Sequence, residues 1–131
     1  MIAFLDTSAV FASLDTADQD HDRAVAVWRE IEQSGGGLVT HNYVALEATA
    51  LVQRRLGMDA VRALHEKVLS SVATVWITEH VHERAVAKLL YSPRGLSLVN
   101  LVSFEVMRDC KIRNAFSFDG DFAAHGFTLV P

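Results

Sequence analysis

Two acidic clusters stand near the two ends of the chain, and each follows a short apolar run. Asp6 ends the run over residues 2–6, while Asp119 and Asp121 follow the run over residues 115–118. If both runs are strands of an open parallel sheet, their carboxyl ends meet at one edge, where we expect Asp6 and Asp119 to share a crevice. Carboxylates gathered in a crevice repel each other unless they hold protons or a cation. The pattern therefore predicts a hard divalent cation and metal-assisted chemistry.

Glu47 is a third candidate because it lies within an apolar helical stripe. It comes three residues after Val44 and four before Leu51, so it is expected to point inward with them. A lone carboxylate in such a place is costly unless it is paired or bound to a metal. The alternative is an ordinary ion pair with Arg54 or Arg55, and the spacing alone does not decide between the two.

Asn100 is the fourth candidate. It lies three residues after Ser97, the expected N-cap of a helix over residues 97–112, and a simple capping role is one interpretation. Asn100 also shares a helical stripe with Phe104 and Met107, which favours an inward position.

The remaining residues that bind metals or act as nucleophiles are less informative. The six histidines show no zinc spacing, and His41, just before the Glu47 helix, is expected on the surface or at the border of the crevice. The single Cys110 permits no internal disulfide and favours a reducing cytoplasm. No apolar run reaches the ~18 residues of a membrane span, and the N-terminus does not resemble a signal peptide. We therefore expect one cytoplasmic domain over residues 1–131, with no membrane association.

Short apolar runs alternate with amphipathic segments along the whole chain, which predicts a parallel sheet covered by helices on both faces. Ser8 is expected to cap a short first helix and Asn42 a longer one that Gly57 ends. The expected strands are residues 2–6, 38–40, 74–78, 115–118 and 127–130, and the expected later helices are residues 21–33, 42–55, 59–71, 79–90 and 97–112, with loops at 15–22 and 92–95.

Charge is unevenly distributed, although the whole chain carries only −4. Residues 1–35 hold seven acids and two bases, whereas residues 84–113 hold two acids and six bases. A basic segment of this kind can follow a phosphate backbone, but it can equally form solvated helix faces. The bases are Arg84, Lys88, Arg94, Arg108, Lys111 and Arg113.

Four motifs occur in a fixed order along nearly the whole chain. They are Asp6-Thr7-Ser8 after a strand, Asn42-Tyr43-Val44 followed by Glu47, Leu96-Ser97-Leu98-Val99-Asn100 at the start of a helix, and Phe118-Asp119-Gly120-Asp121-Phe122. Together they resemble the motifs of PIN-domain ribonucleases, and more narrowly those of VapC toxins of bacterial toxin–antitoxin pairs. The stretch from Ser97 to Phe127 is most similar to VapC toxins that act on the sarcin–ricin loop of large-subunit rRNA; other VapC toxins cut tRNA.

The resemblance implies an α/β/α sandwich and a Mg²⁺- or Mn²⁺-dependent endoribonuclease. It makes Asp6 the first metal ligand, Glu47 the second acid, Asp119 the fourth and Asp121 an auxiliary acid, with Thr7 and Ser8 orienting Asp6 or water. It further implies a homodimer and a VapB-like antitoxin, whose arginine would enter the crevice in place of the cation.

Asn100 occupies the third acidic position and departs from the Asp of the family pattern. A neutral amide oxygen replaces an anionic ligand, so a hard cation should bind more weakly, while the near-isosteric side chain leaves the fold intact. We therefore predict that the chain as given is nearly inactive. An engineered change and a natural loss of the site would both leave Asn here.

Three other functions compete with this one. A haloacid-dehalogenase-like phosphohydrolase would need a second Asp two residues after Asp6, where Ser8 stands. A response-regulator receiver would need a mid-chain Asp at a strand end, but Asp59 begins a helix. A catalytically dead RNA-binding or antitoxin-binding PIN module stays open because of Asn100.

Overall fold

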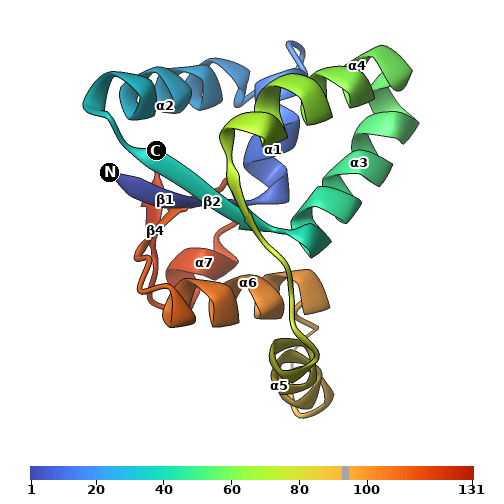
Figure 1. Cartoon of the computed structure of the whole chain (residues 1–131), viewed down its shortest axis with the longest axis vertical. Coiled ribbons are helices and arrows are strands. Elements are labelled where there is room, and N and C mark those ends of the chain that lie inside the picture. Colours follow the sequence, from blue (N-terminus) through green and yellow to red (C-terminus); the bar gives the residue numbers. More distant parts are fainter. Residues whose placement is uncertain (93–94) are drawn as a thin grey trace.

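A five-stranded, all-parallel sheet forms the centre of the molecule, as predicted (Figure 1). The computed structural model describes residues 1–92 and 95–131. The strand order is β3-β2-β1-β4-β5, so the chain builds the sheet outward from β1 in one direction and then returns to build it in the other. The strands are β1 (Ile2–Leu5), β2 (Gly37–His41), β3 (Ala73–Val75), β4 (Asn114–Phe116) and β5 (Thr128–Val130).

Helices cover both faces of the sheet, which confirms the expected α/β/α sandwich. In Figure 1, α1 to α4 lie on one side of the strands and α5 to α7 lie on the other. The helices are α1 (Thr7–Leu14), α2 (His21–Ser34), α3 (Asn42–Leu56), α4 (Met58–Ala63), α5 (Glu79–Leu90), α6 (Leu98–Asp109) and α7 (Asp121–Ala124), with a π-helical turn η1 (Leu64–Val68) and a 3-10 turn η2 (Leu69–Ser71) after α4.

The alternation of side chains along the strands divides the apolar core into two halves. Leu5 and Phe116 pack into the half beneath α1 to α4, whereas Phe4 and Ala115 pack into the half beneath α6 and α7. All four side chains are fully buried. Because successive strand residues point to opposite faces, one buried strand supplies both halves and fixes the sheet between two helical layers.

An ion-pair cluster around the buried Glu105 carboxylate joins α5 to α6. The Glu105 carboxylate accepts hydrogen bonds from Lys88 and Arg84, and Arg84 also pairs with Asp109 at 2.8 Å. Burial alone would raise the pKa of Glu105, but the hydrogen bonds and charges of Lys88 and Arg84 outweigh it and hold this pKa below its usual value. Arg84 and Lys88, two of the six bases of residues 84–113, are therefore used in ion pairs within the fold.

The structure departs from the expected elements in several places. The single helix expected over residues 59–71 is instead α4, η1 and η2, where Ser70 and Ser71 hydroxyls donate to the carbonyls of Glu66 and Val68 at 2.7 and 2.8 Å. Such local bonds compete with regular helix geometry. The four-residue α7 was not predicted because it is too short to show a helical period.

Thr7, and not a residue after Ser8, begins α1, since Asp6 stands at the N-cap position. The expected loop at 92–95 includes Pro93 and Arg94, which lie outside the described residues. Across residues 1–92 and 95–131, no helix is both long and apolar enough to cross a membrane.

Candidate active site

The strand order creates a crevice between β1 and β4, at the carboxyl edge of the sheet. The chain leaves β1 toward β2 on one side and reaches β4 on the other, and ligands of open α/β sheets bind where the order reverses in this way. The backbone N–H of Asp6 donates to the carbonyl of Phe116 at 3.1 Å, which extends the ladder between the two strands by one more bond. Asp6 is thereby held beside Ser117, the residue that follows β4.

All five residues singled out in the sequence line one pocket of about 410 Å³ at this edge. It is called the acidic pocket below. Four segments from distant parts of the chain contribute to it, which is what the proposed convergence of strand ends and helix starts requires. The lining residues are Asp6, Thr7, Ser8, Glu47, Leu51, Gly95, Ser97, Asn100, Asp119 and Asp121.

Asp6 is the deepest of these carboxylates. Only 4% of it is exposed, and its Oδ2 accepts hydrogen bonds from the hydroxyls of Ser8 and Ser117 at 2.9 and 2.8 Å. Burial raises the pKa of Asp6, and the hydrogen bonds from Ser117, Ser8 and the backbone of Thr7 and Ser8 counter this only in part. A cation in the pocket would therefore stabilise the ionised form of this carboxylate.

Asn100 and Asp119 are in direct contact. The Asn100 Nδ2 donates to Asp119 Oδ2 at 2.9 Å, while the Asn100 backbone N–H is capped by the Ser97 hydroxyl at 3.0 Å. The two interpretations of Asn100 are thus compatible, because its backbone serves the helix cap while its side chain faces the acids. Asp119 Oδ1 also accepts from the backbone N–H of Asp121 at 2.9 Å, which fixes the carboxylate from both sides.

Glu47 lines the same pocket, but it is exposed at the rim and not buried along the inward stripe as predicted. Its helix turns the buried side chains Val44, Ala48 and Val52 toward the core and leaves Glu47 at the boundary. Among the described residues no ion pair involves Glu47, so the alternative partners Arg54 and Arg55 do not neutralise it.

Ser117 contacts two of the candidate acids, and the sequence did not suggest it as part of the candidate site. Its hydroxyl donates to Asp6 and accepts from the backbone N–H of Asp119 at 3.0 Å, so one side chain orients both acids. The available signal in the sequence was a serine between Phe116 and Phe118 in an apolar run, and the structure buries this serine. The Oγ1 of Thr7, which is also buried, has no hydrogen-bond partner within the described part of the chain.

The residues of the acidic pocket fit a hard cation in kind. Carboxylate and amide oxygens, which line this pocket, suit Mg²⁺ or Mn²⁺. The number of grouped ligands fits a metal ion less well. Within residues 1–92 and 95–131, no three His, Cys, Asp or Glu side chains lie close enough together to hold a metal ion. Beside Asp119, Asn100 contributes a neutral amide and not a further carboxylate.

His41 is not a surface residue, and this corrects the sequence-based expectation. It is fully buried, and it replaces the predicted Asn42 as the N-cap of α3, because its Nδ1 accepts from the backbone N–H groups of Tyr43 and Val44 at 3.1 and 3.2 Å. Its Nε2 lies 2.8 Å from the Ser103 hydroxyl. Burial lowers the pKa of His41 to about 3, so the ring is neutral at physiological pH.

Comparison with known proteins decides the family. The model of the PIN domain matches residues 3–127, nearly the full length of the chain. The chain belongs to the PIN-domain family. This membership confirms the resemblance that the four ordered motifs indicated.

The chain also shows a more specific similarity to individual PIN-domain proteins. The chain is 36% identical over 129 residues, or 97% of its length and 96% of the relative's, to the 23S rRNA-specific endonuclease VapC20 of Mycobacterium tuberculosis. The crystal structure of VapC20, described as a sarcin–ricin loop cleaving toxin, superposes with a TM-score of 0.87 at 34% identity and covers 98% of this chain and 97% of that one. The structure of VapBC2 from Rickettsia felis bound to promoter DNA, with 11% identity and a TM-score of 0.70 over 98% and 97%, shows the same fold.

Proposed function

We propose that this protein is a metal-dependent endoribonuclease toxin that cleaves structured RNA and so inhibits translation. The sarcin–ricin loop of large-subunit rRNA is the first candidate substrate, and tRNA is the second. The observation that carries the proposal is the convergence of Asp6, Glu47, Asn100 and Asp119 on one pocket in a chain 36% identical to a 23S rRNA-specific endonuclease. A ribosomal substrate also favours a cytoplasmic location.

Each side chain of the acidic pocket has a distinct part in the proposed mechanism. Asp6, Glu47, Asn100 and Asp119 would hold Mg²⁺ or Mn²⁺, with Asp121 as an auxiliary acid. The ion, when bound, supplies a nucleophilic water near neutral pH and stabilises the charge that develops on the phosphate. Ser8 and Ser117 keep Asp6 oriented by their hydrogen bonds. Glu47 is open to solvent and can accept a proton from an incoming water.

The chemistry of attack determines the expected products. Because water attacks the phosphate, the RNA 2′-hydroxyl is not needed as a nucleophile. The products should then carry 5′-phosphate and 3′-hydroxyl ends.

Asn100 impairs this proposed site. Its Nδ2–H presents a donor to Asp119 where a carboxylate would present an acceptor to the cation. The unaltered chain should therefore be nearly inactive, and Asn100→Asp should restore cleavage.

The test compares the two forms on ribosomes and on tRNA, with Mg²⁺ or Mn²⁺ and with EDTA, followed by mapping of the cleavage ends. We expect EDTA-sensitive cleavage by Asn100→Asp at one or a few sites and little by the unaltered chain. Equal, EDTA-insensitive cleavage by both forms would overturn the assignment of Asn100 and of the metal.

A catalytically dead PIN module is the second candidate function. It is favoured by the Asn100–Asp119 hydrogen bond, which satisfies a carboxylate oxygen without any cation. This candidate would bind RNA or an antitoxin without cutting RNA. Absence of metal-dependent cleavage by Asn100→Asp, together with retained binding, would favour it.

We further propose two protein partners, a second copy of the chain and a VapB-like antitoxin. Support for an antitoxin site comes from an apolar pocket of about 580 Å³ beside the acidic one, lined among others by Tyr43, Leu46, Leu69 and Trp76. It is called the apolar pocket below. Leu46 and Glu47 are consecutive on α3, so the two pockets adjoin across this helix.

A further inference from the structure

Three of the six bases of residues 84–113 gather at the end of α6, at the opposite edge of the sheet from the acidic pocket. Arg108, Lys111 and Arg113 are exposed and line one pocket of about 570 Å³ together with His125 and Phe127. It is called the basic pocket below. Within the described part of the chain, no carboxylate pairs with any of these three side chains. Arg94 lies outside the described residues.

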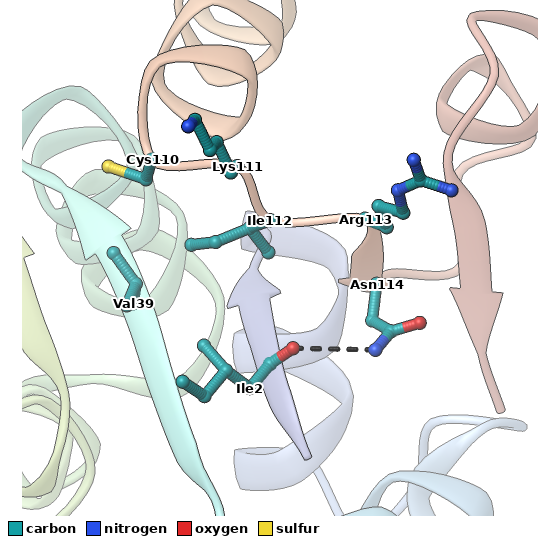
Figure 2. Close-up of a pocket in the computed structure, with 7 residues that line it drawn as sticks. All are labelled: Ile2, Val39, Cys110, Lys111, Ile112, Arg113 and Asn114. Atoms are coloured by element: carbon teal, nitrogen blue, oxygen red, sulfur yellow. Dashed lines mark hydrogen bonds between the residues drawn. The ribbon is translucent and has the colours of Figure 1, made fainter.

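Figure 2 shows a neighbouring pocket at the same edge of the sheet. Ile112 points toward Val39 and Ile2, whereas the Arg113 side chain extends away from them. The apolar side chain is thus buried against the sheet, and the two basic residues on either side of it remain outside. The alternation keeps Lys111 and Arg113 available to a ligand in solvent.

Two of the polar groups are held in place by aromatic rings. The guanidinium of Arg108 lies 5.6 Å from the centre of the Phe127 ring, and the His125 ring stacks on Phe104 with centroids 4.6 Å apart. His125 Nδ1 lies 2.8 Å from the carbonyl of Asp121, which can only accept, so Nδ1 carries the proton and Nε2 is an acceptor when the ring is neutral. The basic pocket therefore offers three cations and an acceptor suited to a ribose hydroxyl.

We propose that the basic pocket binds the sugar–phosphate backbone of the RNA substrate, as a second contact away from the cleavage site. This rests on the proposed ribonuclease function. Unpaired cations on a chain of net charge −4 are complementary to phosphates. The distance also suits one folded RNA, because α6 carries Asn100 near its start and Arg108 near its end, about 12 Å apart at 1.5 Å per residue.

The variant Lys111→Gly/Arg113→Gln tests this without threatening the fold. Lys111 has a φ of 57°, in the left-handed region that favours glycine, so its replacement removes a charge and relieves the backbone. Arg113 is exposed and has no ion-pair partner among the described residues. The matched control is Arg29→Gln, which removes an exposed charge from α2 on the other face of the sheet (Figure 1).

The measurement is fluorescence anisotropy of an RNA hairpin containing the sarcin–ricin sequence, in EDTA and at several salt concentrations. We expect the double variant to bind about 10-fold more weakly near 0.15 M salt, and its plot of log K against log salt to be shallower by about 1.5 to 2. Arg29→Gln should change neither quantity.

The outcomes separate the two proposals. If the unaltered chain binds RNA and the double variant binds it equally well with the same slope, the role of the basic pocket is overturned while the ribonuclease proposal stands. If the unaltered chain binds no RNA and Asn100→Asp cuts none, both are overturned. A double variant that keeps its RNA affinity but loses binding to polyglutamate would assign the basic pocket to an acidic protein partner and overturn the RNA assignment.

Discussion

At the scale of single residues, Asn100 decides the electrostatics of the acidic pocket. As a hydrogen-bond donor to Asp119 at 2.9 Å, it removes a repulsion that two facing carboxylates would create. Its neutrality should therefore stabilise the metal-free protein at the expense of metal binding. The same atoms that weaken the proposed catalysis would make the fold easier to maintain.

This opposition between stability of the metal-free protein and metal binding leads to a prediction about thermal stability. Asn100→Asp without metal should lower the free energy of unfolding by about 1–3 kcal/mol, which is about 3 to 10 °C in Tm for a domain of this size. Saturating Mg²⁺ or Mn²⁺ should restore most of this loss, because a ligand that binds only the folded state stabilises it. Differential scanning fluorimetry with a metal titration measures both effects.

The control is Asn114→Asp, which adds the same charge at the amino end of β4, away from the acidic pocket. It should show no metal-dependent recovery. A Tm of Asn100→Asp that does not respond to either metal would contradict the assignment of this position as a ligand.

The sequence pointed to all five candidate residues that line the acidic pocket, but it did not give the depth of each one. Asp6 and Asp119 follow from strand ends, and Asn100 from a helical stripe that is buried as expected. Glu47 shows the limit, because a helical period gives a direction and cannot tell where the core stops and the rim begins. Ser117 was missed because its role depends on a partner 111 residues away in the chain.

At the scale of elements, α3 depends on a buried histidine. His41 caps this helix with Nδ1 and reaches Ser103 of α6 with Nε2, so one neutral ring links the two helices that carry Glu47 and Asn100. Periodicity predicted α3 well, but it assigned the cap to Asn42, a common capping residue. Capping by a buried His depends on the tertiary position of Ser103, which no local pattern contains.

Neutrality of this ring predicts a pH dependence of stability. His41 has a pKa of about 3 when folded and about 6.5 when unfolded, so unfolding takes up a proton at intermediate pH. Its contribution is complete above about pH 6.5 and is lost as the pH falls toward 3, which amounts to about 2 kcal/mol between pH 7.5 and pH 5. Urea denaturation at a series of pH values measures it.

The test variant is His41→Asn, which keeps a capping acceptor but does not titrate. Its unfolding free energy should be lower at pH 7.5 and should fall less between pH 7.5 and pH 5 than that of the unaltered chain. His80→Asn, at an exposed position of α5, should keep the full pH dependence. Parallel curves for the unaltered chain and His41→Asn would show that another group causes the loss.

At the scale of the whole molecule, the parallel sandwich was predictable and the strand order was not. Alternating strands and helices require a parallel sheet, but only the paired registers of β1 with β2 and β4 reveal that the order reverses between β1 and β4. Charge segregation was visible in the sequence as well. The structure shows that the bases of residues 84–113 fall into two groups. Arg84 and Lys88 are neutralised by Glu105 within the fold. The others that the structure describes, which have no ion-pair partner among the described residues, are Arg108, Lys111 and Arg113.

We predict that the protein is a homodimer in solution. Leu90 and Tyr91, at the end of α5, are 73% and 87% exposed, and adjacent apolar side chains of this size favour burial against a partner. Light scattering at micromolar concentration should give twice the 14.4 kDa of one chain. Leu90→Lys should shift the mass toward the monomer, whereas Ile2→Lys, at a position 59% exposed on the edge opposite the acidic pocket, should not. A monomer mass for the unaltered chain would refute the prediction.

The last prediction concerns binding of the antitoxin across the two adjoining pockets. An amphipathic segment could fill the apolar pocket around Leu46 and Trp76, which are 71% and 75% exposed, and place an arginine among the carboxylates of the acidic pocket. Apolar contacts respond little to salt, whereas the arginine contacts are screened. The chain with Asn100 should therefore bind the antitoxin with less salt sensitivity than Asn100→Asp, which gains one negative charge.

Calorimetry at two salt concentrations measures the difference, which we expect to be about 1 kcal/mol, or roughly fivefold in Kd. The control Leu46→Ala removes an apolar contact without adding a charge and should weaken binding to both forms by similar factors. If the Asn100 form fails to bind while Asn100→Asp binds tightly, the carboxylates dominate recognition and the apolar pocket is not the main anchor. Equal salt sensitivity of the two forms would instead mean that no antitoxin cation reaches Asp6 or Asp119, and the arginine would have to lie outside the acidic pocket.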